Sequence, residues 1–289
     1  MPATLTVIMP TYNSGRHLRA CLESFKAQTL SSWELICVDR GSTDDTRPIL
    51  DEYARAWPQM RVLETGDERT SQFNAGVRAS TSDFIYYTAS DFYVDPNLLE
   101  DAVKVAVNGP ADCVWINCIS YGDAFWARVR NLERCNYFGS EKFEGARFFR
   151  RSLYEKVGGY DDAVPIFEEF DLQDRMRAAG ATFGRVTTAA EYHLDEPQTL
   201  GEIWRRSFYI GTRYRDLLAK QGARALRHTN PVRSTFFKDS GRFVRHPRLT
   251  LGFVLLLLAK YGGGAAGVVA SGFTKGRSHR ARYGAKPAD

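Results

Sequence analysis

The chain has 289 residues and a net charge of +5, with 44% hydrophobic and 25% charged residues. These proportions are ordinary for a globular protein and exclude a disordered or low-complexity chain, and the length allows one large α/β domain plus an appendage. The five cysteines show no CxxC spacing, which indicates buried free thiols in a reducing compartment. They are Cys21, Cys37, Cys113, Cys118 and Cys135.

The N-terminal segment predicts two short apolar strands, beginning at Leu5 and Trp33, with a helix of about 15 residues between them. Such a βαβ unit has parallel strands, and ligands of such sheets lie at the carboxyl ends of the strands. The residues at those ends are Pro10, Thr11, Tyr12, Asn13 and Asp39. Because an aromatic ring can stack on a base and a carboxylate can accept from a base N–H or a ribose hydroxyl, these residues indicate a nucleotide ligand.

The segments IMPTYNSGRHLRACLESFKAQTL and WELICVDRGSTDDT resemble, in order, the N-terminal signature of family 2 glycosyltransferases. The resemblance implies a GT-A fold, which is a Rossmann-like α/β fold with a mainly parallel sheet and flanking helices. It also implies a nucleotide-sugar donor, with Asp39 as the acid that contacts the base. The chain departs from the family at Arg40, where a second Asp is common.

The following segments predict strands over 61–64, 84–88 and 113–119 and helices over 70–80 and 97–107. Asn74, Gly76, Ala79 and Ile85 match the family's second motif, but its Asp-x-Asp falls on Ala89-Ser90-Asp91. The resemblance places Asn74 and Ser90 among the nucleotide-sugar contacts. It implies Asp91 as a ligand of Mg²⁺ or Mn²⁺, since an ion that bridges a pyrophosphate needs only one or two carboxylates.

Aromatic and arginine residues alternate through residues 120–150. This pattern alone is compatible with stacking on nucleic acid. Its position between a sheet strand and a probable catalytic loop favours a pocket for acceptor or pyrophosphate, with Arg147 as the candidate phosphate contact.

The segment from Arg150 to Gly180 resembles the family's motif around its general base. Sugar transfer with inversion needs one base that deprotonates the acceptor hydroxyl. The resemblance maps this base to Glu169, where the family has Asp, with Glu168 as the alternative and Asp171 as a support. The acidic pair is expected to open a helix, where the helix dipole also favours carboxylates.

A strand predicted over 181–186 is followed by His193 and by a helical segment that resembles the tail of membrane-associated prokaryotic members of the family. Only one Asp of the metal motif remains. His193 is therefore a candidate second metal ligand, or a hydrogen-bond donor to the pyrophosphate, alongside a purely structural role.

Residues 205–289 hold 18 Lys/Arg and 3 Asp/Glu, whereas residues 1–204 hold 21 Lys/Arg and 31 Asp/Glu. The C-terminal part is therefore strongly basic and the preceding part is net acidic. Residues 249–273 are apolar apart from Lys260, long enough to span a membrane, and flanked by basic residues. We expect a catalytic domain over 1–215 and a basic helical extension over 216–289. A helix in the membrane interface, or a hairpin dipped into it, is favoured over a span; a helix pair packed on the domain is the alternative. The flanking residues are Arg242, Arg245, His246, Arg248, Lys275, Arg277, Arg280 and Arg282.

The sequence thus predicts a metal-dependent, inverting hexosyltransferase that uses a nucleotide sugar. Its acceptor would be a glycan, a lipid-linked sugar or a polysaccharide precursor. With no signal peptide visible, we expect it at the cytoplasmic face of the cell membrane, peripheral or monotopic, in contact with lipid and not with nucleic acid. The alternatives are a catalytically degenerate module that only binds nucleotide sugar or glycan, a nucleotidyltransferase, an unrelated doubly wound domain, and an RNA-binding protein that uses the basic tail.

Overall fold

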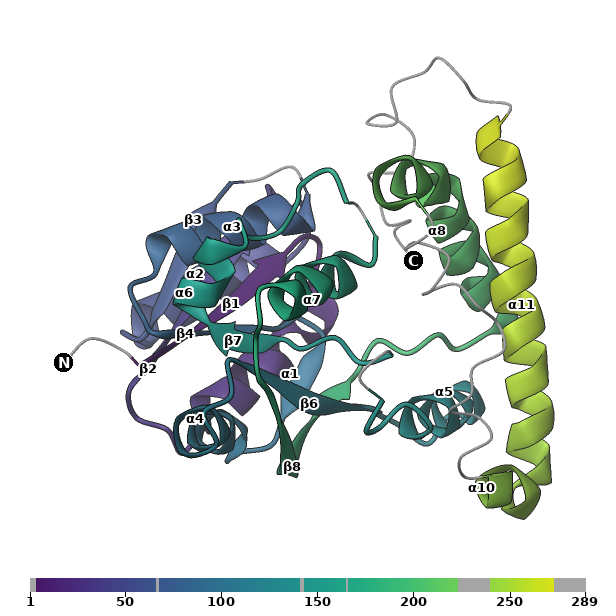
Figure 1. The fold of residues 1–289 in the computed structure, drawn as a ribbon, viewed down its shortest axis with the longest axis horizontal. Coiled ribbons are helices and arrows are strands. Elements are labelled where there is room, and N and C mark those ends of the chain that lie inside the picture. The colour runs from purple at the N-terminus through teal and green to yellow at the C-terminus, as the bar shows by residue number, and fades with distance from the viewer. Residues whose placement is uncertain (1–3, 66–67, 141–142, 165, 223–239, 273–289) are drawn as a thin grey trace.

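The computed structural model describes residues 4–65, 68–140, 143–164, 166–222 and 240–272. Within these ranges an eight-stranded mixed sheet has the order β3-β2-β1-β4-β7-β6-β8-β5 (Figure 1). Its strands are β1 (Leu5–Thr11), β2 (Trp33–Asp39), β3 (Met60–Glu64), β4 (Phe84–Tyr87), β5 (Phe92–Val94), β6 (Cys113–Ser120), β7 (Phe148–Arg150) and β8 (Phe183–His193).

The strands β1, β2, β3 and β4 are parallel, and their register places Thr11 opposite Asp39. The short β7 runs antiparallel between β4 and β6, and β8 continues the sheet parallel to β6. The edge strand β5 is antiparallel to β8 and pairs Phe92 with His193. The loops after β1 and β2 and the end of β8 therefore hold the candidate binding residues.

Helices cover both faces of the sheet because successive residues of a buried strand point to opposite sides. Leu5, Val7 and Met9 of β1 pack with α1, α2 and α4, whereas Ile8 packs with α3, α6 and α7. These helices are α1 (Gly15–Lys26), α2 (Thr46–Ala56), α3 (Arg69–Ala79), α4 (Leu98–Asn108), α6 (Arg151–Lys156) and α7 (Glu168–Ala178). Both the family's fold and the strands and helices predicted in this half of the chain are confirmed.

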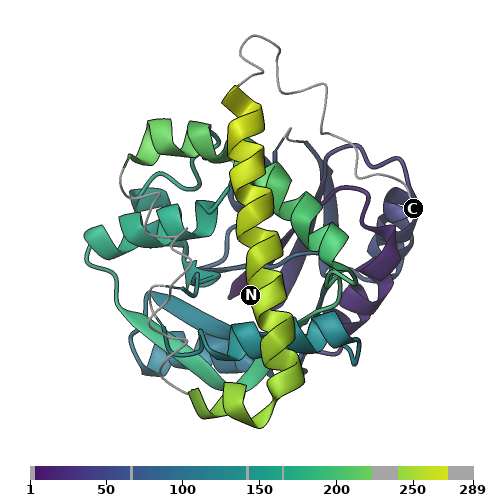
Figure 2. The same ribbon diagram turned by 90° about the vertical axis from the view of Figure 1, so that its right-hand side faces the viewer.

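Four further helices lie beside the sheet: α5 (Phe125–Cys135), α8 (Leu200–Gln221), α10 (Ser240–Arg245) and α11 (Pro247–Gly272). Figure 2 shows α11 running along the outside of the molecule. Val129 and Leu132 of α5, Ile203 of α8, and Phe253 and Leu256 of α11 form one apolar cluster. The glycines of α11 allow close helix packing, since a Cβ at Gly267 would lie 2.1 Å from the carbonyl oxygen of Phe208.

The C-terminal half decides between two expected forms and lengthens a strand. The apolar segment is one uninterrupted helix, so the helix is present and the alternative hairpin is not; the Gly-rich part stays helical where it packs against α8. The strand expected over 181–186 extends to His193, which pairs with Ser120 and Phe92. Helix α8 continues across the expected boundary at residue 215. The basic residues Lys275, Arg277, Arg280 and Arg282 lie outside the described residues.

The helix α11 has one packed face and one exposed face. It is the one helix of the described residues that is long and apolar enough to cross a membrane, and 22% of its most apolar stretch is buried. Leu251, Val254 and Leu258 are exposed on the outer side, which is unusual for a helix of a water-soluble core. The inner face of α11 thus packs on the domain, as the helix-packing alternative expects, and the membrane hypothesis concerns only its exposed outer face.

Candidate active site

The loops after β1 and β2 are fastened to each other through Asp39. This carboxylate is 1% exposed and accepts hydrogen bonds from the hydroxyls of Thr11 (2.9 Å) and Ser42 (2.6 Å) and from the backbone N–H groups of Gly41 and Ser42. Four donors occupy the acceptor positions of a carboxylate. Asp39 thus shapes the nucleotide loop from within, and its direct contact with a base remains a prediction.

Two neighbours complete these loops. Asn13, which has a φ of 47°, accepts from the backbone N–H of Thr43 (2.9 Å), so the turn after Pro10 and Thr11 is fixed against the second loop. The ring of Tyr12 carries the Arg40 guanidinium at 3.9 Å from its centre. Arg40, the departure from the family pattern, thus builds a flat platform with Tyr12, and a base can stack on such a surface.

Gln72 was not identified from the sequence, yet it holds the ends of both strands. Its buried amide donates to the carbonyl oxygens of Thr11 (2.9 Å) and Val38 (2.6 Å) from α3. A lone Gln in a helix carries no signal for this role, because the two carbonyls come together only in the folded sheet.

Asn74, in contrast, is committed to a turn. Its side chain donates to the carbonyl oxygen of Tyr160 (3.0 Å), accepts from the backbone N–H of Tyr160 (3.1 Å), and accepts from the hydroxyl of Tyr154. These contacts hold the Gly158-Gly159 turn in place, and the expected donor contact stays a prediction.

The two predicted metal ligands lie together. The Nε2 atom of His193 is 3.6 Å from Oδ2 of Asp91, and both side chains are partly exposed. Ser90 beside them is almost buried. Within the described ranges no three His, Cys, Asp or Glu side chains converge to hold an ion by themselves. A carboxylate and an imidazole fit a divalent ion that takes its other ligands from phosphate and water.

The imidazole of His193 has a carboxylate behind it. The Oε1 atom of Glu196 is 3.3 Å from Nδ1 and also accepts from the Ser120 hydroxyl (2.7 Å) and from Arg134 (2.9 Å). Burial alone would raise the pKa of Glu196, but His193, Arg134 and Arg130 outweigh it and hold this pKa well below its usual range. The two ring nitrogens of His193 thus face two carboxylates, Nδ1 toward Glu196 and Nε2 toward Asp91.

Arg147 is close to the candidate metal ligand His193, with the ring of Phe92 in contact with both. Its guanidinium forms an ion pair with the fully buried Glu191 and stands 4.7 Å from the centre of the Phe92 ring, which also contacts His193. Glu191 is itself held by the Tyr86 hydroxyl (2.6 Å). Arg147 is therefore anchored from below, and its expected phosphate contact would use the remaining part of the guanidinium.

The acidic pair opens α7, as expected, directly after Phe167 with its left-handed φ of 58°. Glu168 is buried and paired with Arg69. Burial raises its pKa, which Arg69 opposes and Glu169 reinforces. Glu169 is only half-buried and comes close to Gly145, where an added Cβ would lie 3.1 Å from its own. Of the two carboxylates, Glu169 is the one available to a ligand.

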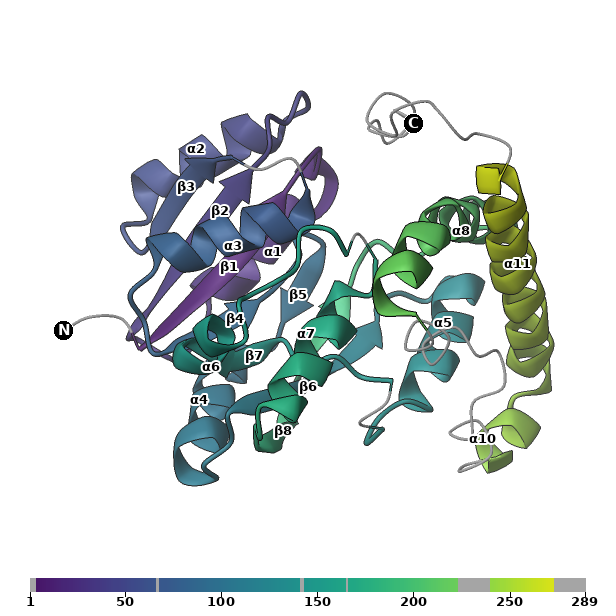
Figure 3. The ribbon, with the colours of Figure 1, turned by 45° about the horizontal axis from the view of Figure 1, so that its top comes forward.

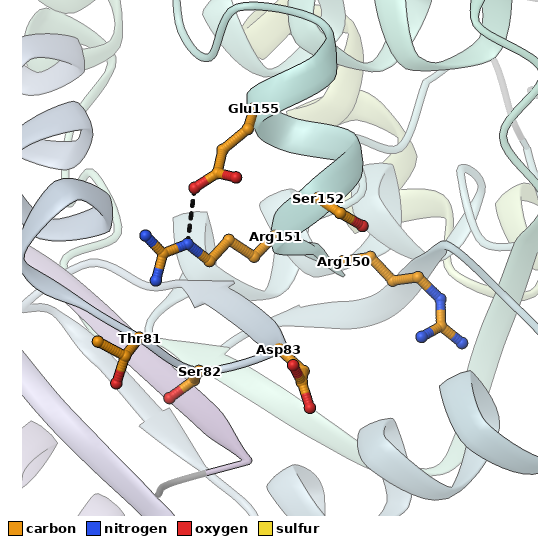
Figure 4. A pocket seen from close by; sticks show the side chains of 7 residues that line it. All are labelled: Thr81, Ser82, Asp83, Arg150, Arg151, Ser152 and Glu155. Carbon is orange, nitrogen blue, oxygen red and sulfur yellow. Dashed lines mark hydrogen bonds and ion pairs between the residues drawn. The ribbon is translucent and has the colours of Figure 1, made fainter.

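One open pocket of about 330 Å³ lies at the other edge of the sheet, before β4 (Figure 4). Its arginines are already paired, Arg151 with Glu155 (2.7 Å) and Arg150 with Asp112 (3.3 Å). The pocket is thus separate from the loops at the carboxyl ends of β1 and β2.

The sheet and its carboxyl-edge loops define a Rossmann-like nucleotide-dependent domain of the GT-A type. The model of the family described as "Glycosyl transferase family 2" matches residues 6–161, more than half of the chain. The chain belongs to this family, which confirms the resemblance seen in the sequence.

Relatives and solved structures agree with this assignment. A "PGL/p-HBAD biosynthesis glycosyltransferase" of Mycobacterium tuberculosis is 28% identical over 175 residues, which are 59% of this chain and 68% of the relative. A mannosyltransferase of Pyrobaculum calidifontis, solved with GDP-Man and Mn²⁺, is similar in fold with a TM-score of 0.58 and 18% identity, over 96% of this chain and 77% of that one. Residues 1–349 of S. aureus TarS, solved with UDP-GlcNAc, give a TM-score of 0.54 and 15% identity over 94% and 89%.

Proposed function

We propose that this family 2 glycosyltransferase transfers a hexose, with inversion, from a nucleotide sugar to an acceptor hydroxyl. The observation that carries the proposal is the approach of His193 to Asp91 (3.6 Å) in the strand-and-loop framework of the family. Two departures from the family motifs, Ala89 and Glu169, are compatible with this reaction, because His193 would supply a metal ligand that Ala89 cannot and Glu169 keeps a carboxylate.

The nucleotide would lie on the joined loops after β1 and β2, with its base on the Tyr12–Arg40 platform. Asp39 and Gln72 hold these loops, so the platform is formed before the ligand arrives, which lowers the cost of binding. The solved structures with UDP-GlcNAc and GDP-Man support a nucleotide-sugar donor of this kind.

The diphosphate of the nucleotide would lie between Arg147 and a metal ion at Asp91 and His193. Asp91 and His193 would hold Mg²⁺ or Mn²⁺, and the ion would supply positive charge that stabilises the leaving nucleoside diphosphate. Arg147, anchored by Glu191, adds a fixed cation on the same side of the sheet. The Mn²⁺ in the mannosyltransferase structure supports this metal.

Glu169 would act as the general base. It accepts the proton of the acceptor hydroxyl as the hydroxyl oxygen attacks the anomeric carbon and the bond to the diphosphate breaks. Glu168 is less suited, since Arg69 already neutralises it and burial closes it to the acceptor. Its pairing instead keeps the start of α7 in place.

The acceptor would be a lipid-linked sugar or a polysaccharide precursor at the cytoplasmic face of the membrane, reached by a peripheral or monotopic enzyme. The exposed apolar side of α11 supports this, as do Arg242, Arg245 and Arg248 at its start.

A thermal-shift panel of UDP-, GDP- and dTDP-sugars, each with Mn²⁺ and with EDTA, tests the donor proposal. We expect one nucleotide class to raise the unfolding midpoint in Mn²⁺ and to lose most of that effect in EDTA. Release of nucleoside diphosphate from the bound nucleotide sugar then distinguishes an enzyme from a module that only binds the nucleotide sugar. No shift with any nucleotide sugar would contradict the proposal.

A further inference from the structure

A series of ion pairs connects α11 with the candidate metal ligands. The Lys260 ammonium of α11 contacts Glu133 of α5 at 2.9 Å, and Arg130 forms an ion pair with the same carboxylate. Arg130 also stands 3.5 Å from Glu196, which in turn contacts His193. Figures 1 and 3 show α5 between the sheet and α11, so these ion pairs run from α11 through α5 to the end of β8.

We propose that Glu196 is a positioning residue for His193, and that Lys260 of the packed α11 sets the charge balance that keeps Glu196 in place. The metal centre of the proposed enzyme is thereby tuned by the helix that carries the exposed apolar face. This inference rests on the proposed function, because it concerns how Asp91 and His193 hold a metal ion.

The first half of the argument is geometric. Glu196 is almost fully buried; Ser120 and Arg134 donate hydrogen bonds to its Oε1 atom, and Nδ1 of His193 lies 3.3 Å from the same oxygen. A carboxylate fixed in this way can hold Nδ1 of an imidazole and leave Nε2 free for a metal, as second-shell carboxylates commonly do. Neutral Gln at this position keeps the size but weakens the hold on the ring.

The second half concerns how Arg130 is shared. Glu133 is fully buried and is compensated by Lys260, by Arg130 and by the Tyr137 hydroxyl at 2.7 Å. Without Lys260, Arg130 becomes the main cation at Glu133, because an uncompensated buried carboxylate is costly. Arg130 is then drawn away from Glu196, and the support of His193 loosens.

Apolar packing ties the same elements together. Phe253 and Leu256 of α11 pack on Val129 and Leu132, which lie within two residues of Arg130 on the same helix. A Cβ at Gly252 would lie 2.7 Å from Phe125 and Val129, so α11 approaches α5 closely at its start as well. Any shift of α11 therefore moves the helix that supplies Arg130 and Arg134.

The experiment measures Mn²⁺ affinity by electron paramagnetic resonance on the full chain, with UDP and with GDP present. We expect Glu196→Gln to weaken Mn²⁺ binding by about tenfold or more. Lys260→Met is expected to weaken it by about threefold or more, and Lys260→Arg to restore most of the loss. In the double variant Lys260→Met/Glu133→Gln the Mn²⁺ affinity should return toward that of the wild type, since no carboxylate at position 133 is then left to draw Arg130 away from Glu196.

The matched control is Arg150→Met, at the opposite edge of the sheet (Figure 4). Arg150 also pairs with one carboxylate, and its side chain is 34% exposed, compared with 32% for Lys260. A general loss of stability would affect both variants, whereas the inference predicts weaker Mn²⁺ binding only for Lys260→Met. Wild-type Mn²⁺ affinity in folded Glu196→Gln and Lys260→Met would overturn the inference and leave the proposed function standing. Absence of Mn²⁺–nucleotide binding in the wild type would overturn both.

Discussion

The two ends of the candidate site are built in different ways. The nucleotide end, at the loops after β1 and β2, is held by backbone groups, hydroxyls and one amide around Asp39 and Gln72. The metal end, at His193, is held by ionised side chains from α5, α11 and the segment after β8. Hydrogen bonds from uncharged donors resist salt and small displacements, whereas buried ion pairs depend on every partner being present.

The two ends also differ in how far the family model covers them. The nucleotide end lies within residues 6–161 matched by the family model, whereas His193, Glu196 and Lys260 lie beyond them. We therefore expect changes at the nucleotide end to remain local. Changes at the metal end should spread to α5 and α11.

The largest expected effect is that of Glu169→Gln on turnover. Loss of a general base typically lowers the rate by about 10²–10⁴-fold, and donor affinity should stay near that of the wild type, because the base acts on the acceptor. The measurement is nucleoside diphosphate release under saturating donor, with Glu168→Gln as the companion. If Glu168→Gln is inactive and Glu169→Gln is active, the assignment of the base is wrong by one position.

Next in size is the loss of stability in Glu133→Gln, at about 3–5 kcal/mol, which is typical for breaking a buried ion pair. Burial alone would raise the pKa of Glu133, but Lys260 and Arg130 hold it well below its usual range. A lowered pKa gives stability that is present above the unfolded pKa of about 4.5 and is lost as the pH falls toward the folded pKa.

Denaturant unfolding from pH 7 to pH 3 checks this sign. The difference between the wild type and Glu133→Gln should be greatest near neutral pH and should shrink below about pH 4.5. A difference that grows on acidification would contradict the ion-pair account of the metal end.

Asp39→Ala should weaken donor binding by about 1–3 kcal/mol, because the loop donors around the carboxylate lose their acceptor. Mn²⁺ binding should change less, since the two ends are held independently. Calorimetry with the nucleotide alone separates the two effects, and Asp44→Ala, an exposed loop carboxylate that accepts from Gly15, serves as the milder control. Unchanged nucleotide affinity in folded Asp39→Ala would rule out its role in this loop.

The smallest effects are expected at the membrane face. Replacing Arg245 or Arg248 with Ala should weaken binding to anionic lipid vesicles by about 1 kcal/mol each, and salt should mimic the change. Leu258→Glu should abolish the salt-resistant part, whereas Val107→Glu, which is exposed on α4, should not. A wild-type chain that does not sediment with anionic vesicles at low salt would contradict membrane attachment.

The sequence predicted the parallel core and its helices because strand ends, turn residues and apolar runs are local signals. It named His193 as a candidate partner of Asp91 alongside a purely structural role, because one motif Asp is missing, and the two side chains lie 3.6 Å apart. It did not predict Gln72, Glu196 or the partner of Lys260, since those contacts join residues that are far apart in the chain. It left open whether the apolar segment is a helix or a hairpin, because glycines suited to a turn are also suited to close helix packing.

The most direct test of the central claim is calorimetric titration of the wild type and Asp91→Asn with the donor found in the panel, each with Mn²⁺ and with EDTA. The account predicts that the wild type binds the donor tightly in Mn²⁺ and weakly in EDTA, whereas Asp91→Asn binds equally weakly in both. Donor binding by the wild type that is the same with Mn²⁺ and with EDTA would contradict it.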